Sequence, residues 1–203
     1  MLNTGTLRYN SVIPRGEITA RMVANLLPTG DKIVILRIPG RLVKPMLENA
    51  VSAYPKLDGR FATFSGLKYA FDATRSPGDR VHSIVDSEGR PFNFNREYNI
   101  ALKYFISLGR DGYTCFQDPE VRYIRDVYGA PFVVDAVLES LRKFGPEFGK
   151  DQLNSLSAEY IERRQRRIEL LHASENNVTK DGYIKIAPRI EGRIIKAPHP
   201  EKP

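Results

Sequence analysis

The segment Gly109-Arg110-Asp111-Gly112-Tyr113 carries the strongest signal in this 203-residue chain. Its two glycines flank an aspartate, and glycine lets a backbone bend closely around a ligand because it has no Cβ. An aromatic residue, Phe105, precedes Asp111 by six positions. Taken alone, Phe105 is also typical of a core residue and Asp111 of a turn residue.

A second informative segment, Asn3-Thr4-Gly5-Thr6-Leu7-Arg8, lies at the other end of the chain. It supplies an amide and a guanidinium, whose planar fork suits phosphate or carboxylate. The alternative for Arg8 is a surface ion pair.

The pattern of apolar residues between these segments predicts a mixture of helices and short strands. Thr19 is expected to cap the first helix. The expected helices cover residues 20–27, 41–53 and 132–144, and the expected strands cover 32–38, 61–64, 67–71, 80–85 and 98–102. Pro45 falls inside the second helix, so that helix either begins near Pro45 or is kinked there.

The chain after Gly145 has a different character. Residues 152–171 have an apolar stripe at helical spacing, made by Leu153, Leu156, Tyr160, Ile168 and Leu171. We therefore predict an α+β fold, a mixed sheet with packed helices, over residues 1–145. An appended helix and loop follow over 146–182, closing strands return to the domain over 183–195, and an extended tail covers 196–203.

Short motifs in a fixed order show a resemblance that covers residues 2–144 and 183–195. They are Ile13–Thr19, Leu26–Pro28, Leu47–Val51, Phe64–Tyr69, Pro77–Val81 and Ile190–Ile194, together with the two segments above. In this order they resemble the C-terminal, substrate-binding domain of the family of 5'-nucleotidases, UDP-sugar hydrolases and 2',3'-cyclic phosphodiesterases. The resemblance implies that domain's α+β fold, without the N-terminal metallophosphoesterase domain that performs the hydrolysis.

The resemblance also assigns roles to individual residues. Phe105 matches one of two aromatic rings that enclose the base, and Asp111 matches the acceptor for the ribose hydroxyls. Asn3 and Arg8 match residues that reach phosphate, base or sugar. Thr29 stands where the family usually has the other ring, and a threonine cannot stack, so nucleotide binding is expected to be weak.

No catalytic residue, metal site or cofactor is predicted. A two-metal phosphoesterase needs clustered Asp, His and Asn ligands, whereas His82, His172 and His199 are far apart in the sequence. Cys115 has no nearby histidine to activate it. We therefore expect a protein that is not an enzyme.

Composition and charge bear on the partners and the location of the protein. A net charge of +7 suits an acidic partner, but no nucleic-acid-binding motif accompanies it. No transmembrane segment or secretory signal is expected, and the localisation is left open with a lean to mitochondria. Protein partners are expected at Arg163, Arg164, Arg166 and Arg167 and at Pro198 and Pro200.

Two functions stay open. The first is a non-catalytic accessory subunit of a larger assembly. The alternative is a nucleotide-specificity module whose metal-binding catalytic domain is a separate chain. They differ in whether Arg8, Phe105 and Asp111 converge on an open cleft or are covered by neighbouring protein.

Overall fold

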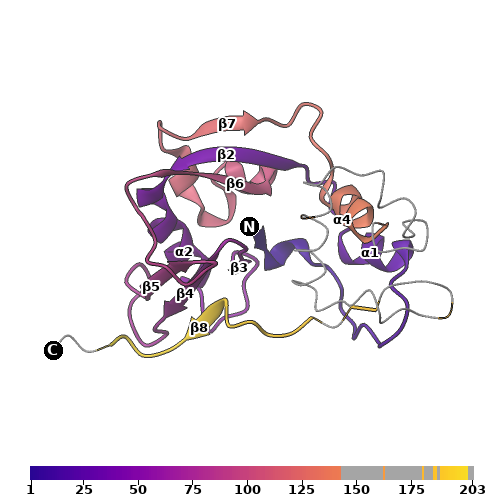
Figure 1. The fold of residues 1–203 in the computed structure, drawn as a ribbon, viewed down its shortest axis with the longest axis horizontal. Helices are drawn as coiled ribbons and strands as arrows, with labels where there is room; N and C mark the ends of the chain where they lie inside the picture. Colours follow the sequence, from indigo (N-terminus) through magenta and orange to yellow (C-terminus); the bar gives the residue numbers. More distant parts are fainter. Residues whose placement is uncertain (143–161, 163–179, 181–184, 187, 201–203) are drawn as a thin grey trace. The chain divides into compact units, whose positions relative to one another are not determined.

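The computed structural model describes residues 1–142, 162, 180, 185–186 and 188–200. The chain divides into two compact units, one of Met1–Val134 with Gly192–Pro203 and one of Asp135–Glu191. The sheets that the described residues form all lie in the first unit, with strand orders β1-β3, β6-β2-β7 and β5-β4-β8 (Figure 1).

The strands are short, and most pairings are antiparallel. Their bounds are β1 Leu2–Asn3, β2 Ile33–Pro39, β3 Ala62–Thr63, β4 Leu67–Phe71, β5 Val81–Asp86, β6 Glu97–Lys103, β7 Arg122–Arg125 and β8 Ile194–Lys196. The helices are α1 Ala20–Leu26, α2 Val43–Val51, α3 Tyr104–Ser107 and α4 Val133–Arg142, with 3-10 turns η1 Thr4–Thr6, η2 Gly40–Leu42, η3 Arg110–Gly112 and η4 Thr114–Gln117. The predicted α+β class is confirmed.

The start of α1 follows the predicted capping. The Thr19 hydroxyl accepts a hydrogen bond of 3.2 Å from the backbone N–H of Met22. This bond satisfies one of the N–H groups that the first helical turn leaves without a partner. The helix ends at Leu26, just before the segment that carries Pro28 and Thr29.

The helix α2 resolves the question of Pro45. It begins at Val43, directly after the 3-10 turn η2. Pro45 therefore lies in the first turn, where its missing N–H breaks no helical hydrogen bond. The helix buries Met46, Leu47 and Val51 in the main core, and in Figure 1 it lies between β2 and β6 on one side and β4 and β5 on the other.

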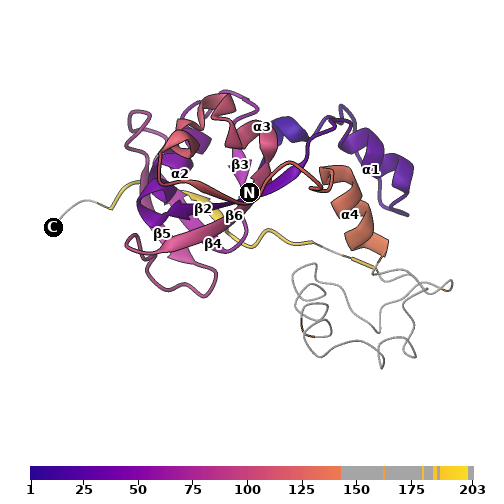
Figure 2. The same ribbon diagram turned by 90° about the horizontal axis from the view of Figure 1, so that it is seen from above.

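The N-terminal segment is part of this core. Strand β1 pairs with β3, so that Asn3 lies opposite Ala62. In Figure 2 the N-terminus lies beside β3 and α3, the helix that precedes the Asp111 loop. The two segments that stood out in the sequence therefore meet in space.

The last strand of the described chain, β8, is shorter than the closing strands predicted over 183–195. Strand β8 begins at Ile194 rather than at residue 190, and it pairs in parallel with β4, with Tyr69 opposite Ile194 (Figure 1). The expectation that the chain projects outward from residue 196 is wrong as far as His199. The Ala197 N–H donates to Phe71 O, at 3.0 Å, and the His199 N–H donates to Asp72 Oδ2, at 2.9 Å.

Several predictions after residue 131 are tested only in part. Residues 183–184 of the predicted strand 183–186 lie outside the described residues, and residues 185–186 are described but form no strand. Most of the helix predicted at 152–171 also lies outside the described residues, with the four arginines Arg163, Arg164, Arg166 and Arg167. The helix predicted at 132–144 is observed as α4, over Val133–Arg142. None of the helices in the described part of the chain has the length and apolar character that a membrane crossing requires.

Candidate functional site

The Asp111 loop has a left-handed backbone at three positions. The φ angles are 77° at Gly109, 54° at Asp111 and 80° at Gly112. Left-handed geometry strains residues other than glycine, although aspartate tolerates it better than most. A Cβ on Gly112 would also lie 2.6 Å from Asn49 Oδ1, so this position requires glycine for two independent reasons.

Asn3 links this loop to the N-terminal strand. Its side chain is 2% exposed, and its Nδ2 donates to Asp111 Oδ2, at 3.0 Å, and to Gly59 O, at 2.8 Å. The Thr6 hydroxyl donates to Asn3 Oδ1, at 2.8 Å. Because both ends of the amide are bonded, Asn3 is fixed in one orientation and holds the carboxylate of Asp111.

Asp111 is held from a second side by α2. Asn49 Nδ2 donates to the backbone O of Asp111, at 3.0 Å. The remaining carboxylate oxygen, Oδ1, makes no hydrogen bond with any residue that the structure describes. Since the side chain is half-buried and oriented, Oδ1 is available to accept hydrogen bonds from hydroxyl groups of a ligand.

Tyr113 anchors the end of the loop in the core. Its ring is fully buried and stacks on Phe116, with centroids 6.0 Å apart, and its hydroxyl donates to Arg60 O, at 2.6 Å. Burial raises the pKa of Tyr113 above its usual range, so the phenol stays protonated and remains a donor.

Phe105 projects from α3 and keeps 41% of its surface exposed. The ammonium group of Lys103 lies 5.5 Å from the centre of its ring, within range of a cation–π interaction. Lys103 is itself buried and forms an ion pair of 2.7 Å with Asp31. A charged group therefore contacts the aromatic ring that the resemblance assigns to base stacking.

Thr29 lies two residues before Asp31. Its hydroxyl oxygen is buried and has no hydrogen-bond partner among the residues that the structure describes. A buried polar atom left without a partner costs about 1–3 kcal/mol. The loop after α1 is thus connected to Phe105 through the Asp31–Lys103 pair, but it offers a hydroxyl where the family has a ring.

Arg8 is exposed, and its Nε donates to Gly5 O, at 2.7 Å. Gly5 packs tightly, because a Cβ there would lie 3.1 Å from both Asn3 Nδ2 and Gly59 Cα. Arg8 therefore borders the Asn3 network without contacting Asp111. Of the five predicted residues, the structure joins Asn3 and Asp111 directly, and it connects Thr29 and Phe105 only through other residues.

Sequence reasoning missed three residues of this site. Asn49, Lys103 and Asp31 all make the contacts described above. Asn49 lies inside the Leu47–Val51 motif, and Lys103 interrupts an otherwise apolar run, so both left a signal in the sequence. The sequence gives no signal for Asp31 other than its position two residues after Thr29.

Three further titratable groups, His82, His199 and Cys115, were considered in the sequence. The rings of His82 and His199 lie 5.0 Å apart, closer than their sequence positions suggested. Within the described ranges, no three His, Cys, Asp or Glu side chains are grouped so that they could hold a metal ion. Burial raises the pKa of Cys115 to about 11, which suppresses the reactive thiolate at neutral pH.

Comparisons with known proteins identify the family of the chain. A family model described as "5'-nucleotidase, C-terminal domain" matches residues 1–118. The protein 5NUC of Lutzomyia longipalpis is 30% identical over 143 residues, which cover 66% of this chain and 24% of that protein. Human 5'-nucleotidase is 28% identical over 115 residues, which cover 53% of this chain and 20% of the human protein.

Solved structures show the same relationship. The 5'-nucleotidase precursor of Thermus thermophilus superposes with a TM-score of 0.66 and 26% identity, covering 96% of this chain and 30% of that one. The NAD nucleotidase of Haemophilus influenzae gives a TM-score of 0.58 at 24% identity, covering 70% and 26%. The chain thus spans less than a third of each of these relatives. It belongs to the 5'-nucleotidase family, as a form of that family's C-terminal domain.

Proposed function

We propose that this chain is a non-catalytic member of the family, a structural or accessory subunit of a larger assembly that binds nucleotide weakly or not at all. The observation that carries the proposal is that the surroundings of Phe105 differ from the pair of aromatic rings that the resemblance implies. Its ring is contacted by the Lys103 ammonium, and Thr29 contributes a buried hydroxyl in place of a second aromatic side chain.

The magnitude of this change supports weak binding. Stacking of a base on an aromatic side chain contributes about 1–3 kcal/mol, so the loss of one ring lowers affinity roughly tenfold to a hundredfold. A base that stacks on Phe105 must also share the ring with Lys103 or displace it.

Exposed apolar residues before α1 support a protein partner. Val12 is 85% exposed, and Leu7, Ile13 and Ile18 are each about half exposed. Several large apolar side chains in one short segment are typical of a surface that another protein covers. Contacts at Pro198, Pro200 and the four arginines of residues 163–167, and a mitochondrial location, stay predictions.

A second candidate is a nucleotide-specificity module that works with a metal-bearing domain on a separate chain. The geometry of Asp111 favours it, because Asn3 and Asn49 hold the carboxylate and backbone of this residue and leave Oδ1 uncommitted. If the chain has this function, Arg8 and Phe105 contact the same nucleotide that Asp111 binds.

Titration of the purified protein with AMP and UMP, followed by calorimetry and by backbone amide NMR signals, separates the two candidates. The accessory function predicts weak binding or none by the unmodified chain, and a gain in affinity for Thr29→Phe if the remaining site is intact. The specificity module predicts tight binding that Asp111→Asn abolishes. Asp126→Asn is the control, because that exposed aspartate caps a distant turn.

Hydrolysis is tested in the same samples. We expect no phosphate release from AMP, UDP-glucose or 2',3'-cyclic AMP with added Mn²⁺, Zn²⁺ or Co²⁺. Metal-dependent release that a chelator abolishes would overturn the non-catalytic assignment, whatever the binding data show.

A further inference from the structure

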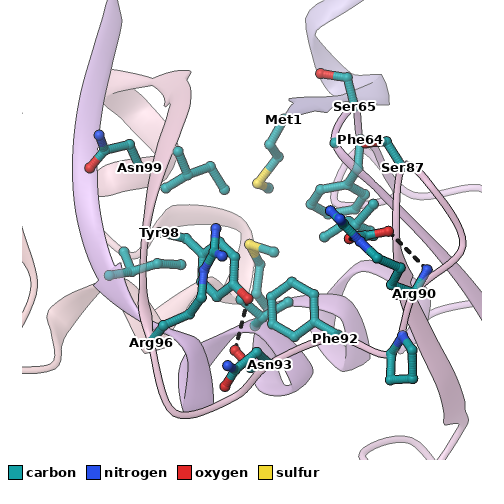
Figure 3. A pocket seen from close by; sticks show the side chains of 18 residues that line it. Met1, Phe64, Ser65, Ser87, Arg90, Phe92, Asn93, Arg96, Tyr98 and Asn99 are labelled. Carbon is teal, nitrogen blue, oxygen red and sulfur yellow. Dashed lines mark hydrogen bonds and ion pairs between the residues drawn. The ribbon is translucent and has the colours of Figure 1, made fainter.

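A cavity of about 510 Å³ opens on the side of the domain formed by β2, β6 and the β4–β5 hairpin (Figure 3). Its lining includes none of the residues of the Asp111 site. The walls are mixed. Apolar side chains come from Met46 of α2, Phe64 before β4, and Phe92 and Ile100 of the chain that leads into and along β6, and polar side chains such as Asn99 lie among them. This volume lies within the range of about 300–1,000 Å³ that small-molecule sites occupy.

One wall of the cavity is held rigidly by stacked planar groups. The rings of Phe92 and Tyr98 are stacked, with centroids 4.5 Å apart and planes 21° apart, and the Tyr98 hydroxyl donates to Asn93 O, at 2.8 Å. The Gly40 N–H donates to Arg96 O, at 2.8 Å. A Cβ on Gly40 would lie 2.7 Å from Phe94 O, so the loop packs directly against this glycine.

Two arginines line the cavity, and they differ in their partners. Arg90 forms ion pairs with Asp86, at 2.7 Å, and with Glu88, at 2.9 Å. Arg96 has its guanidinium 4.6 Å over the Tyr98 ring and has no ion pair with any residue that the structure describes. In Figure 3 both guanidinium groups lie at the cavity, with Arg90 joined to its carboxylate partner.

These charges define the chemistry of a ligand. Asp86 and Arg90 compensate one another, and burial lowers the pKa of the Met1 amino group, whose residue also lines the cavity, to about 6. At neutral pH the main positive charge that remains in the lining is therefore that of Arg96. A guanidinium offers parallel N–H donors that match a carboxylate. A phosphate dianion has no apolar body, so it would leave the apolar side chains of the lining without a partner.

We propose that this cavity is a binding site for a small monocarboxylate with an apolar body, independent of the nucleotide site. The carboxylate pairs with Arg96, and the apolar body fills the space between Phe64, Met46 and Ile100. The stacked Tyr98 ring fixes the guanidinium before the ligand arrives, which reduces the entropy lost on binding.

The test titrates the full chain, enriched in ¹⁵N, with octanoate and follows its amide signals. Octanamide serves as the neutral analogue and inorganic phosphate as the anion without an apolar body. We expect octanoate to shift the signals of Phe92, Tyr98 and Ile100 while those of Asn3 and Asp111 stay in place. Octanamide and phosphate should bind much more weakly.

Arg96→Gln should weaken octanoate binding about tenfold to a hundredfold, since a charged hydrogen-bonding partner is lost. Arg21→Gln, at an exposed arginine of α1 that does not line the cavity, is the matched control and should change it little. Arg96→Lys, which keeps the charge and loses the fork, should fall between Arg96→Gln and the unmodified chain. The proposal is overturned if octanamide binds as well as octanoate, if both glutamine variants weaken binding equally, if phosphate competes at the same signals, or if no cavity signal shifts.

Discussion

The side-chain amide of Asn3 donates a hydrogen bond of 3.0 Å to Asp111 Oδ2, across 108 positions of sequence. This bond joins the first strand to the loop after α3, and Asn49 supports the same loop from α2. The orientation of the Asp111 carboxylate therefore depends on groups that come from three separate parts of the chain.

Asn3→Ala should lower the free energy of unfolding by about 1–3 kcal/mol. The substitution leaves the buried Thr6 hydroxyl without its acceptor, which carries a desolvation cost, and it removes one of the two hydrogen bonds that the Gly59 carbonyl accepts. Urea denaturation followed by far-ultraviolet circular dichroism measures the change. Asn10→Ala at an exposed position is the control, and equal effects of the two substitutions would show that the Asn3 network adds no stability.

Gly112→Ala should destabilise the domain more than Gly89→Ala does. Both glycines have positive φ angles, of 80° and 84°, so alanine is strained by about 1–2 kcal/mol at each. A Cβ at residue 89 meets no atom within 4 Å, whereas one at residue 112 lies 2.6 Å from Asn49 Oδ1. The difference between the two variants in denaturant titrations isolates this contact, and a difference of zero would mean that the loop shifts freely.

The Asp31–Lys103 pair should behave as a coupled unit. Lys103→Met alone should cost about 3 kcal/mol, because it leaves the half-buried Asp31 carboxylate unpaired. The double variant Asp31→Asn, Lys103→Met should recover part of that loss. Unfolding free energies of the four proteins complete a double-mutant cycle, and additive effects would contradict the coupling.

Asp72 should make the domain sensitive to acid. Hydrogen bonds from the Thr74 side chain and from the backbone N–H groups of His199 and Thr74 lower the pKa of this carboxyl to about 2. Because the folded pKa lies below the ordinary value of about 3.9, its stabilisation is present above pH 4 and is lost as the pH falls towards 2. Asp72→Asn should show a shallower loss of stability than the unmodified chain over this window. Parallel acid-unfolding curves would refute this role.

The elements that the sequence predicted well are those whose signal is local. Thr19 caps α1 through a residue three positions away, and the apolar run over 32–38 corresponds closely to β2. Strand β7 was missed because all four of its residues are exposed, so no alternation of apolar and polar residues marks it. It is a strand because it pairs with β2, and that pairing cannot be read from its own sequence.

The residues of the candidate site also divide into those that a local motif predicted and those that only the folded structure brings together. Asn3, Arg8, Phe105 and Asp111 were found because each lies in a short motif. The supporting residues Asn49 and Asp31 were not found, because Asn49 reaches Asp111, and Asp31 reaches Lys103, only through folding across many positions of sequence. The ammonium of Lys103 beside the Phe105 ring is a property of side-chain packing, and residue order alone does not specify it.

The parallel pairing of β8 with β4 has a consequence for synthesis of the protein on the ribosome. Tyr69 and Ile194 are partners in the sheet, but Ile194 is made more than a hundred residues after Tyr69. At translation rates of about 5–20 residues per second, one edge of β4 waits roughly ten seconds for its neighbour. An open edge can pair with the same strand of another nascent chain. A pause in translation between these two strands should therefore increase aggregation.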